Sequence, residues 1–96
     1  MIDVAGECVG EVGLSDIDQR RGAALIGWWV AAGHRGNGYA TEAIGRLADA
    51  AVGFGVHTLV AQIGVANEAS IHIATRAGFT LLRAGDDATP HVYVRR

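Results

Sequence analysis

The stretch that decides the fold is GWWVAAGHRGNGYATEAIGRL, residues 27–47. It contains the end of an apolar run, then a basic glycine-rich turn, then the start of a helical pattern. Such a sequence is suited to binding an anion, because small residues let backbone N–H groups approach the anion and the helix N-terminus adds partial positive charge. Arg35 adds a full positive charge beside the turn. The stretch predicts an anion-binding turn, and a plain turn whose glycines adopt positive φ is the alternative.

Two well-known phosphate-binding loops do not match this turn. A Walker-type loop requires Gly-Lys-Ser/Thr, whereas Gly38 is followed by Tyr39 and Ala40. A dinucleotide-binding fingerprint requires a third glycine where this sequence has Thr41. The nature of the anion therefore has to come from the rest of the chain.

The residues before the turn have the pattern of β-strands. Residues 2–14 alternate apolar and polar around a turn at 5–7, which predicts two strands joined by a tight hairpin. Residues 15–23 break this alternation with polar and turn-forming residues. Residues 24–30 form a short apolar run rich in strand formers, which predicts a buried strand with Trp28 and Trp29 on opposite faces.

The residues after the turn have a helical period, followed by alternating elements. Five apolar positions form one stripe of the first predicted helix: Ala40, Ile44, Leu47, Ala51 and Phe54. Gly55 is expected to end this helix, and residues 57–65 predict another buried strand. Asn67 is the expected N-cap of a second helix over residues 68–77, which Gly78 closes with the next residue packing back. Two strands are expected in the remaining tail.

The predicted fold is a single α/β domain over residues 1–96, or α+β in some schemes. It has two helices and a mixed, mostly antiparallel sheet in the order ββ-β-α-β-α-β-β. Half of the residues are hydrophobic and the net charge is -2, which argues against nucleic-acid binding by bulk charge. The sequence shows no membrane-spanning run and no signal peptide, so the cytoplasm is the expected location. No Cys/His spacing suggests a metal site, and Cys8 is expected to be a structural thiol.

Two motifs in the right order resemble one protein family. RGNGYA, residues 35–40, fits the Arg/Gln-x-x-Gly-x-Gly/Ala signature of the GNAT superfamily of acyl-CoA-dependent N-acetyltransferases. The preceding WWV resembles the end of the family's fourth strand. NEASIHIATRAGF, residues 67–79, resembles the family's Asn-x-x-Ser…Ala-x-x-x-Gly-Phe block. The resemblance covers residues 2–94 and is closest to the ribosomal-protein N-terminal acetyltransferase type.

The resemblance implies an acyl-CoA N-acyltransferase fold and transfer of acetyl from acetyl-CoA to a primary amine by direct attack. That amine would belong to a protein N-terminus or a small molecule. Backbone amides would wrap the coenzyme A pyrophosphate at Arg35, Gly36, Asn37, Gly38, Tyr39 and Ala40. Backbone groups of Trp28 and Val30 would bind the pantetheine arm, and an N–H near Trp29 or Val30 would polarise the thioester carbonyl.

The resemblance also implies catalytic roles, each with an ordinary structural alternative. Asn67 would bind a pantetheine amide besides capping its helix. Ser70 would donate a proton to the departing thiolate, or is simply an exposed first-turn serine. Glu11 would act as base through a water, and Tyr93 would donate to sulfur, although both also suit plain strand positions. His91 shares the strand of Tyr93 and would act as a base, or is an ordinary strand residue. No carboxylate lies on the predicted central strand, so no base is assigned there.

One departure from the family concerns the start of the chain. Family members begin with a strand and two helices that shape the acceptor pocket, whereas this sequence begins at the hairpin. We therefore expect an N-terminally shortened domain with exposed apolar sheet surface, and hence self-association as a homodimer. The alternative function is a catalytically silent acyl-CoA-binding or interaction module that lacks an acceptor site.

Overall fold

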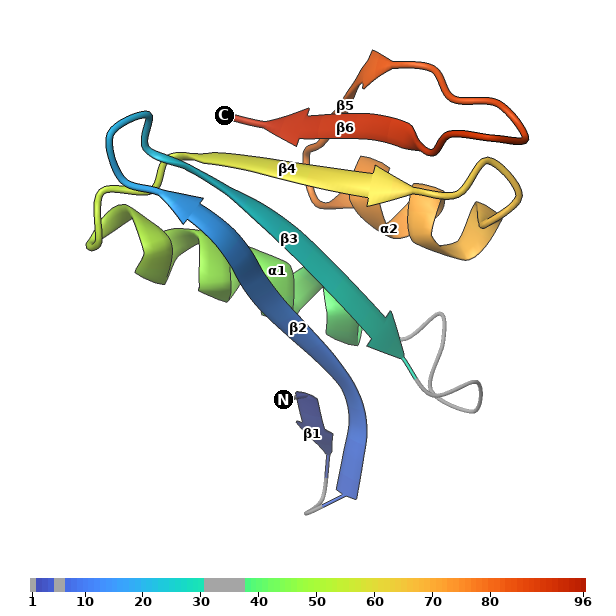
Figure 1. Ribbon diagram of the computed structural model, residues 1–96. Coiled ribbons are helices and arrows are strands. Elements are labelled where there is room, and N and C mark those ends of the chain that lie inside the picture. Colours follow the sequence, from blue (N-terminus) through green and yellow to red (C-terminus); the bar gives the residue numbers. More distant parts are fainter. Residues whose placement is uncertain (1, 5–6, 31–37) are drawn as a thin grey trace.

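A computed structural model describes residues 2–4, 7–30 and 38–96, which form one sheet and two helices (Figure 1). The elements are β1 (Ile2–Val4), β2 (Glu7–Asp18), β3 (Ala23–Val30), α1 (Tyr39–Val52), β4 (Thr58–Ile63), α2 (Glu68–Arg76), β5 (Thr80–Arg83) and β6 (His91–Arg95). The strands form a six-stranded sheet in the order β1-β2-β3-β4-β6-β5. Only the β3–β4 pair is parallel in this sheet. The predicted order of elements and the mixed, mostly antiparallel sheet are confirmed.

Strand β2 is longer than the sequence pattern predicted. We expected residues 15–23 to break the strand, but β2 continues to Asp18 and only residues 19–22 form the turn. Ser15 pairs with Leu25 of β3, on the sheet face that carries no helix. A polar side chain on that face keeps its contact with water, so the backbone ladder outweighs the weak strand preference of these residues.

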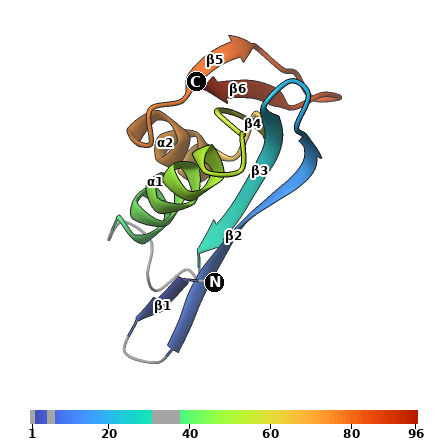
Figure 2. The same ribbon diagram turned by 90° about the vertical axis from the view of Figure 1, so that its left-hand side faces the viewer.

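Both helices cover the same face of the sheet (Figure 2). The core between them combines buried side chains from β3, β4 and both helices: Ala24, Ile26, Leu59, Ala61, Ile63, Ile44, Ala51 and Ala74. The apolar stripe of α1 lies on this core, with Ile44 fully buried and Leu47 partly buried. The inclusion of Phe54 in the stripe was wrong, because α1 ends at Val52 and the Phe54 side chain is 74% exposed.

Both helices end at left-handed glycines, as predicted. Gly55 and Gly78 have φ of 81° and 88°. After each glycine, the N–H of Val56 or Phe79 donates to a carbonyl five residues back in the chain, at 3.0 and 2.9 Å respectively. This is the Schellman arrangement, and it turns both following side chains into the core. Phe79 therefore packs back against the core as expected.

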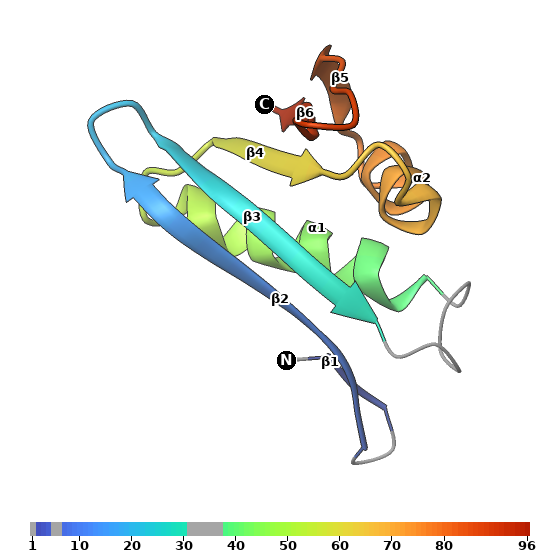
Figure 3. The same ribbon diagram turned by 45° about the vertical axis from the view of Figure 1, so that its right-hand side comes forward.

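The parallel strands β3 and β4 are paired over only part of their length. Their ladder joins only Ala23–Leu25 to Thr58–Val60. Beyond this ladder the two strands diverge, β3 continuing to Val30 and β4 to Ile63 (Figure 3). Each strand then leads toward the N-terminal end of a helix, so two helix N-termini lie near the open end of the gap between these strands.

We expect Gly22→Ala to lower the free energy of unfolding by about 1–3 kcal/mol, because Gly22 has a φ of 65° and alanine is strained there. An added Cβ would also collide with the His57 ring and lie 2.9 Å from the Gly55 carbonyl oxygen. The Gly22 carbonyl accepts the N–H groups of His57 and Thr58, so the strain falls where the β2–β3 turn meets β4. Urea denaturation followed by circular dichroism measures the change.

The matched control is Gly13→Ala, in which the added Cβ meets open space. Its expected change in unfolding free energy is within about 0.5 kcal/mol. Equal losses in the two variants would contradict the special role of Gly22.

Candidate active site

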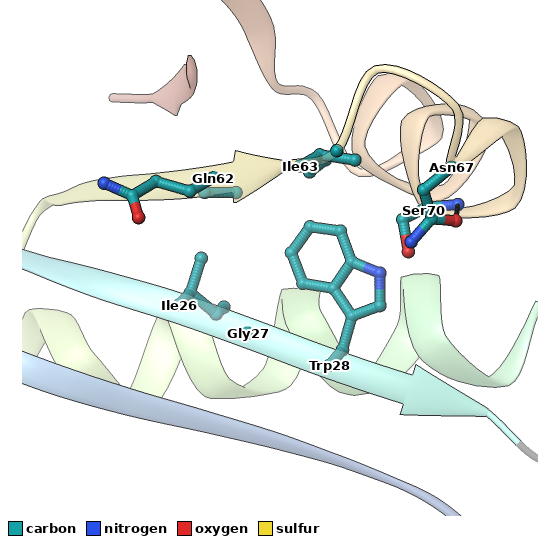
Figure 4. Close-up of a pocket in the computed structure, with 9 residues that line it drawn as sticks. Ile26, Gly27, Trp28, Gln62, Ile63, Asn67 and Ser70 are labelled. Atoms are coloured by element: carbon teal, nitrogen blue, oxygen red, sulfur yellow. Dashed lines mark hydrogen bonds between the residues drawn. The ribbon is translucent and has the colours of Figure 1, made fainter. Parts of the chain in front are cut away.

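A hollow of about 140 Å³ lies where β3 and β4 diverge (Figure 4). It is lined by residues from both strands and from the start of α2: Ile26, Gly27, Trp28, Ala61, Gln62, Ile63, Gly64, Asn67 and Ser70. Trp28 and the Asn67–Ser70 motif, which lie far apart in the sequence, therefore converge on one site.

The first turn of α2 is fixed by its cap. Asn67 Oδ1 accepts a hydrogen bond from the Ser70 backbone N–H at 3.2 Å, which confirms the predicted N-cap. This bond sets the position of the Ser70 backbone at the edge of the hollow. The Ser70 side chain is half-buried and lines the hollow, so it is not simply an exposed first-turn serine.

The two tryptophans lie on opposite faces of β3, as predicted. Trp28 packs beneath the helices, where its ring is tilted against Phe79 with centroids 6.0 Å apart. Its Nε1 atom is buried and has no hydrogen-bond partner among the described residues. Trp29 is on the other face, where its side chain is 50% exposed.

The glycine-rich turn is described only from Gly38 onward, so Arg35, Gly36 and Asn37 lie outside the described residues. Gly38 caps α1 with a φ of 77°, and its carbonyl accepts the Glu42 N–H at 3.0 Å. Ala40 is buried with Val30 of β3, and Tyr39 packs against this pair. The α1 N-terminus is thereby held beside the end of β3.

A second hollow, of about 360 Å³, lies at β2 and β3 and includes the sheet face without helices. Glu11 and Trp29 are cross-strand partners at one end of it. Gly13 and Gly27 are also cross-strand partners, and a Cβ at either would meet open space. The two hollows share Gly27 and Trp28, so they meet on β3.

Tyr93 and His91 do not line the gap between β3 and β4. Tyr93 is buried in the core, and the two rings meet edge-on with centroids 6.1 Å apart. His91 Nδ1 accepts the Gly85 N–H at 2.8 Å, so that nitrogen has a structural partner. In this arrangement Tyr93 packs in the core, and His91 holds the β5–β6 connection through its bond with Gly85.

Charged groups of the described residues offer no metal site. Across residues 2–4, 7–30 and 38–96, no group of three or more His, Cys, Asp or Glu side chains could hold an ion.

Hydrogen bonds from the Ala88 N–H and from the hydroxyl and N–H of Thr89 lower the pKa of Asp86. Asp86 lies in the β5–β6 connection and does not line either hollow.

A family model described as an acetyltransferase (GNAT) domain matches residues 1–80. The chain belongs to the GNAT acetyltransferase family. No curated protein sequence matches it significantly. Neither helix in the described part of this GNAT chain is long and apolar enough to span a membrane.

Solved structures agree with the GNAT assignment. An acetyltransferase from Agrobacterium tumefaciens str. C58 is 33% identical with a TM-score of 0.79, over 96% of this chain and 55% of that one. The microcin C7 self-immunity acetyltransferase MccE, solved with acetyl-CoA and AMP, is 30% identical with a TM-score of 0.76, over 91% and 53%. A ribosomal-protein-S5-alanine acetyltransferase from Vibrio fischeri shares the fold at 18% identity and a TM-score of 0.79, over 91% and 53%. The chain spans just over half the length of these proteins.

Several residues that line the first hollow were not identified from the sequence. Gln62, Ile63 and Gly64 line the hollow because β4 leaves β3 before reaching them. The hydrophobic pattern of residues 57–65 predicted a strand but not the length of its ladder with β3. The paired glycines at 13 and 27 were also overlooked. A glycine inside a strand often marks a place where a ligand or another backbone approaches the strand closely, or where no side chain packs.

Proposed function

We propose that this protein transfers an acetyl group from acetyl-CoA to a primary amine by direct attack. The observation that carries the proposal is the convergence of Trp28, Asn67 and Ser70 on the hollow between the diverging strands. Membership of the GNAT family supports acetyl-CoA as the donor. The complex of MccE with acetyl-CoA supports the same donor.

The thioester-bearing arm of the donor would lie between β3 and β4. Beyond Leu25, β4 no longer pairs with β3, so the backbone of Ile26 to Trp28 faces the gap. An arm with amide groups can hydrogen-bond such an edge in the manner of an added strand. A backbone N–H near Trp29 would polarise the thioester carbonyl and stabilise the oxyanion that forms on attack.

The pyrophosphate would lie at the N-terminus of α1. Gly38 opens the helix there, and the dipole of a helix N-terminus favours negative charge. Glu42 in the first turn is paired with Arg46 at 2.7 Å, which offsets its repulsion of an anion. Arg35, Gly36 and Asn37 remain predicted ligands of the same group.

The proposed reaction moves one acetyl group and one proton. The neutral amine attacks the thioester carbonyl, the carbon–sulfur bond breaks, and the departing thiolate takes a proton from the Ser70 hydroxyl. Ser70 is reprotonated through water with the proton that the amine loses, so one proton passes in net from the amine to the thiolate. The acceptor would approach from the open sheet face, because its hollow shares Gly27 and Trp28 with the donor hollow. Glu11 lies in that second hollow and would remove the amine proton through a water.

A free-thiol assay with acetyl-CoA and a panel of amines tests this function. The panel should contain peptides with free N-termini, including ribosomal-protein N-terminal sequences, and small polyamines. We expect thiol release that depends on one amine class and exceeds acetyl-CoA hydrolysis without amine. Tight binding of acetyl-CoA without turnover for any amine would instead establish the silent binding module.

We also expect reversible self-association through the face without helices. Trp29 is half-exposed there, and the partly buried Leu25 lies on the same face of β3 four residues earlier in the chain. Sedimentation velocity should show a dimer whose dissociation constant rises at least about ten-fold in Trp29→Asp, because a charge replaces apolar contact. Phe54→Asp is the control, since Phe54 is 74% exposed but lies after α1. A strictly monomeric wild-type protein would contradict this expectation.

A further inference from the structure

The indole N–H of Trp28 is a buried hydrogen-bond donor without an acceptor among the described residues. Buried polar groups in proteins are overwhelmingly paired, because an unpaired one loses its water without compensation. The indole N–H is a donor only, so its missing partner has to be an acceptor.

The direction of this donor is set by packing. The Trp28 ring is tilted at 58° against Phe79, and it belongs to the side chains packed on the main core. Figure 4 shows its nitrogen-bearing edge turned toward Asn67 and Ser70. Asn67 Oδ1 already accepts the Ser70 N–H at 3.2 Å. The donor thus lies covered at the edge of the hollow, on the side of Asn67 and Ser70, and a ligand acceptor reaches it by displacing the side chains that cover it.

The walls of the hollow restrict which acceptor can meet this donor. Ile26, Ala61 and Ile63 make one side apolar, while Asn67 and Ser70 supply polar groups at the other. The volume of about 140 Å³ suits a slender segment rather than a whole coenzyme. A pantetheine thioester is such a chain, and besides one hydroxyl its oxygens are the acceptor-only carbonyl oxygens of its amides and of the thioester.

We propose that Trp28 Nε1–H donates a hydrogen bond to a carbonyl oxygen of the bound acyl donor, which makes Trp28 a specificity-determining residue. This inference rests on the proposed function, because that function places the thioester arm in the hollow. The role belongs to the side chain and is separate from the backbone bonds expected of β3.

Trp28→Phe removes the N–H and keeps an aromatic ring, and Trp29→Phe makes the same change on the opposite face. Calorimetry should show acetyl-CoA affinity falling about three- to ten-fold in Trp28→Phe. The control is Phe54→Leu, which changes an exposed ring outside both hollows and should alter the affinity less than about two-fold. The unfolding midpoint of each free variant is measured alongside. A Trp28→Phe variant that loses stability but keeps full affinity would overturn the inference.

Indole resonances give a readout that does not depend on a substitution. The chain has two tryptophans, so ¹⁵N labelling of the wild-type protein gives two indole signals, which the two tryptophan variants assign. We expect the Trp28 indole proton to move downfield on binding while that of Trp29 stays in place. A shift with acetyl-CoA alone identifies the thioester carbonyl, and an equal shift with coenzyme A identifies an amide carbonyl.

Two outcomes contradict the proposal in distinguishable ways. If calorimetry shows binding but the Trp28 signal does not move, the indole assignment is wrong and the acetyltransferase function stands. If neither acetyl-CoA nor coenzyme A binds, both the assignment and the proposed function fail.

Discussion

Ser70→Ala is expected to lower kcat for acetyl transfer about 100-fold, equivalent to about 2.7 kcal/mol of transition-state stabilisation. The Ser70 side chain is half-buried at the hollow and is proposed to protonate the departing thiolate. The affinity for acetyl-CoA should change by less than about three-fold, because a proton donated only in the transition state does not contribute to ground-state binding. Thiol release measured at saturating donor and amine gives kcat directly.

This substitution leaves the helix cap intact. Asn67 accepts its bond from the Ser70 backbone N–H, which alanine also has. Thr75→Ala is the matched control, since its hydroxyl lies on the same helix and donates to the Ile71 carbonyl at 2.9 Å. Unchanged turnover in Ser70→Ala, or an equal loss in both variants, would rule out proton donation by Ser70.

Ile44→Ala should have the largest effect on stability, lowering the free energy of unfolding by about 2–5 kcal/mol. Ile44 is 0% exposed and lies in the core between α1 and the sheet. Alanine would leave a cavity there in addition to losing the hydrophobic transfer energy. Small domains have a total stability of about 5–15 kcal/mol, so the variant should melt many degrees lower.

Val52→Ala provides the comparison for Ile44→Ala. It removes apolar atoms from the same helix, but Val52 is 61% exposed. Urea denaturation should show a change within about 0.5 kcal/mol for this surface position. A loss below about 1 kcal/mol in Ile44→Ala would mean that α1 does not pack on the sheet as described.

The features predicted correctly from the sequence are those that short segments determine. The Asn67 cap and the glycines that end both helices depend on backbone geometry within a few residues, so their patterns were sufficient. The alternation around Trp28 and Trp29 likewise fixed their faces. Sequence alone was also sufficient to bring Asn67 and Ser70 into one motif.

The errors and omissions depend on long-range pairing. β2 continues through a polar segment because Ser15 and Asp18 still pair with β3, on either side of a register shift, and such pairing depends on the partner strand and not on the local sequence. Phe54 fitted the helical stripe but lies past the last turn of α1. The hollow itself depends on where the β3–β4 ladder stops, and the unused donor of Trp28 depends on which neighbours surround its ring.

The shortness of the β3–β4 ladder has a consequence for how the sheet holds together. Three residue pairs and the overlying α1 join the antiparallel unit β1–β2–β3 to the antiparallel unit β4–β6–β5. The proposed donor site therefore lies at the junction between the two antiparallel units. A ligand arm bound in that gap would contact both β3 and β4. Part of its binding free energy would therefore stabilise the packing of the two antiparallel units against each other. Slower amide exchange in β4 when the site is occupied would be the sign of that coupling.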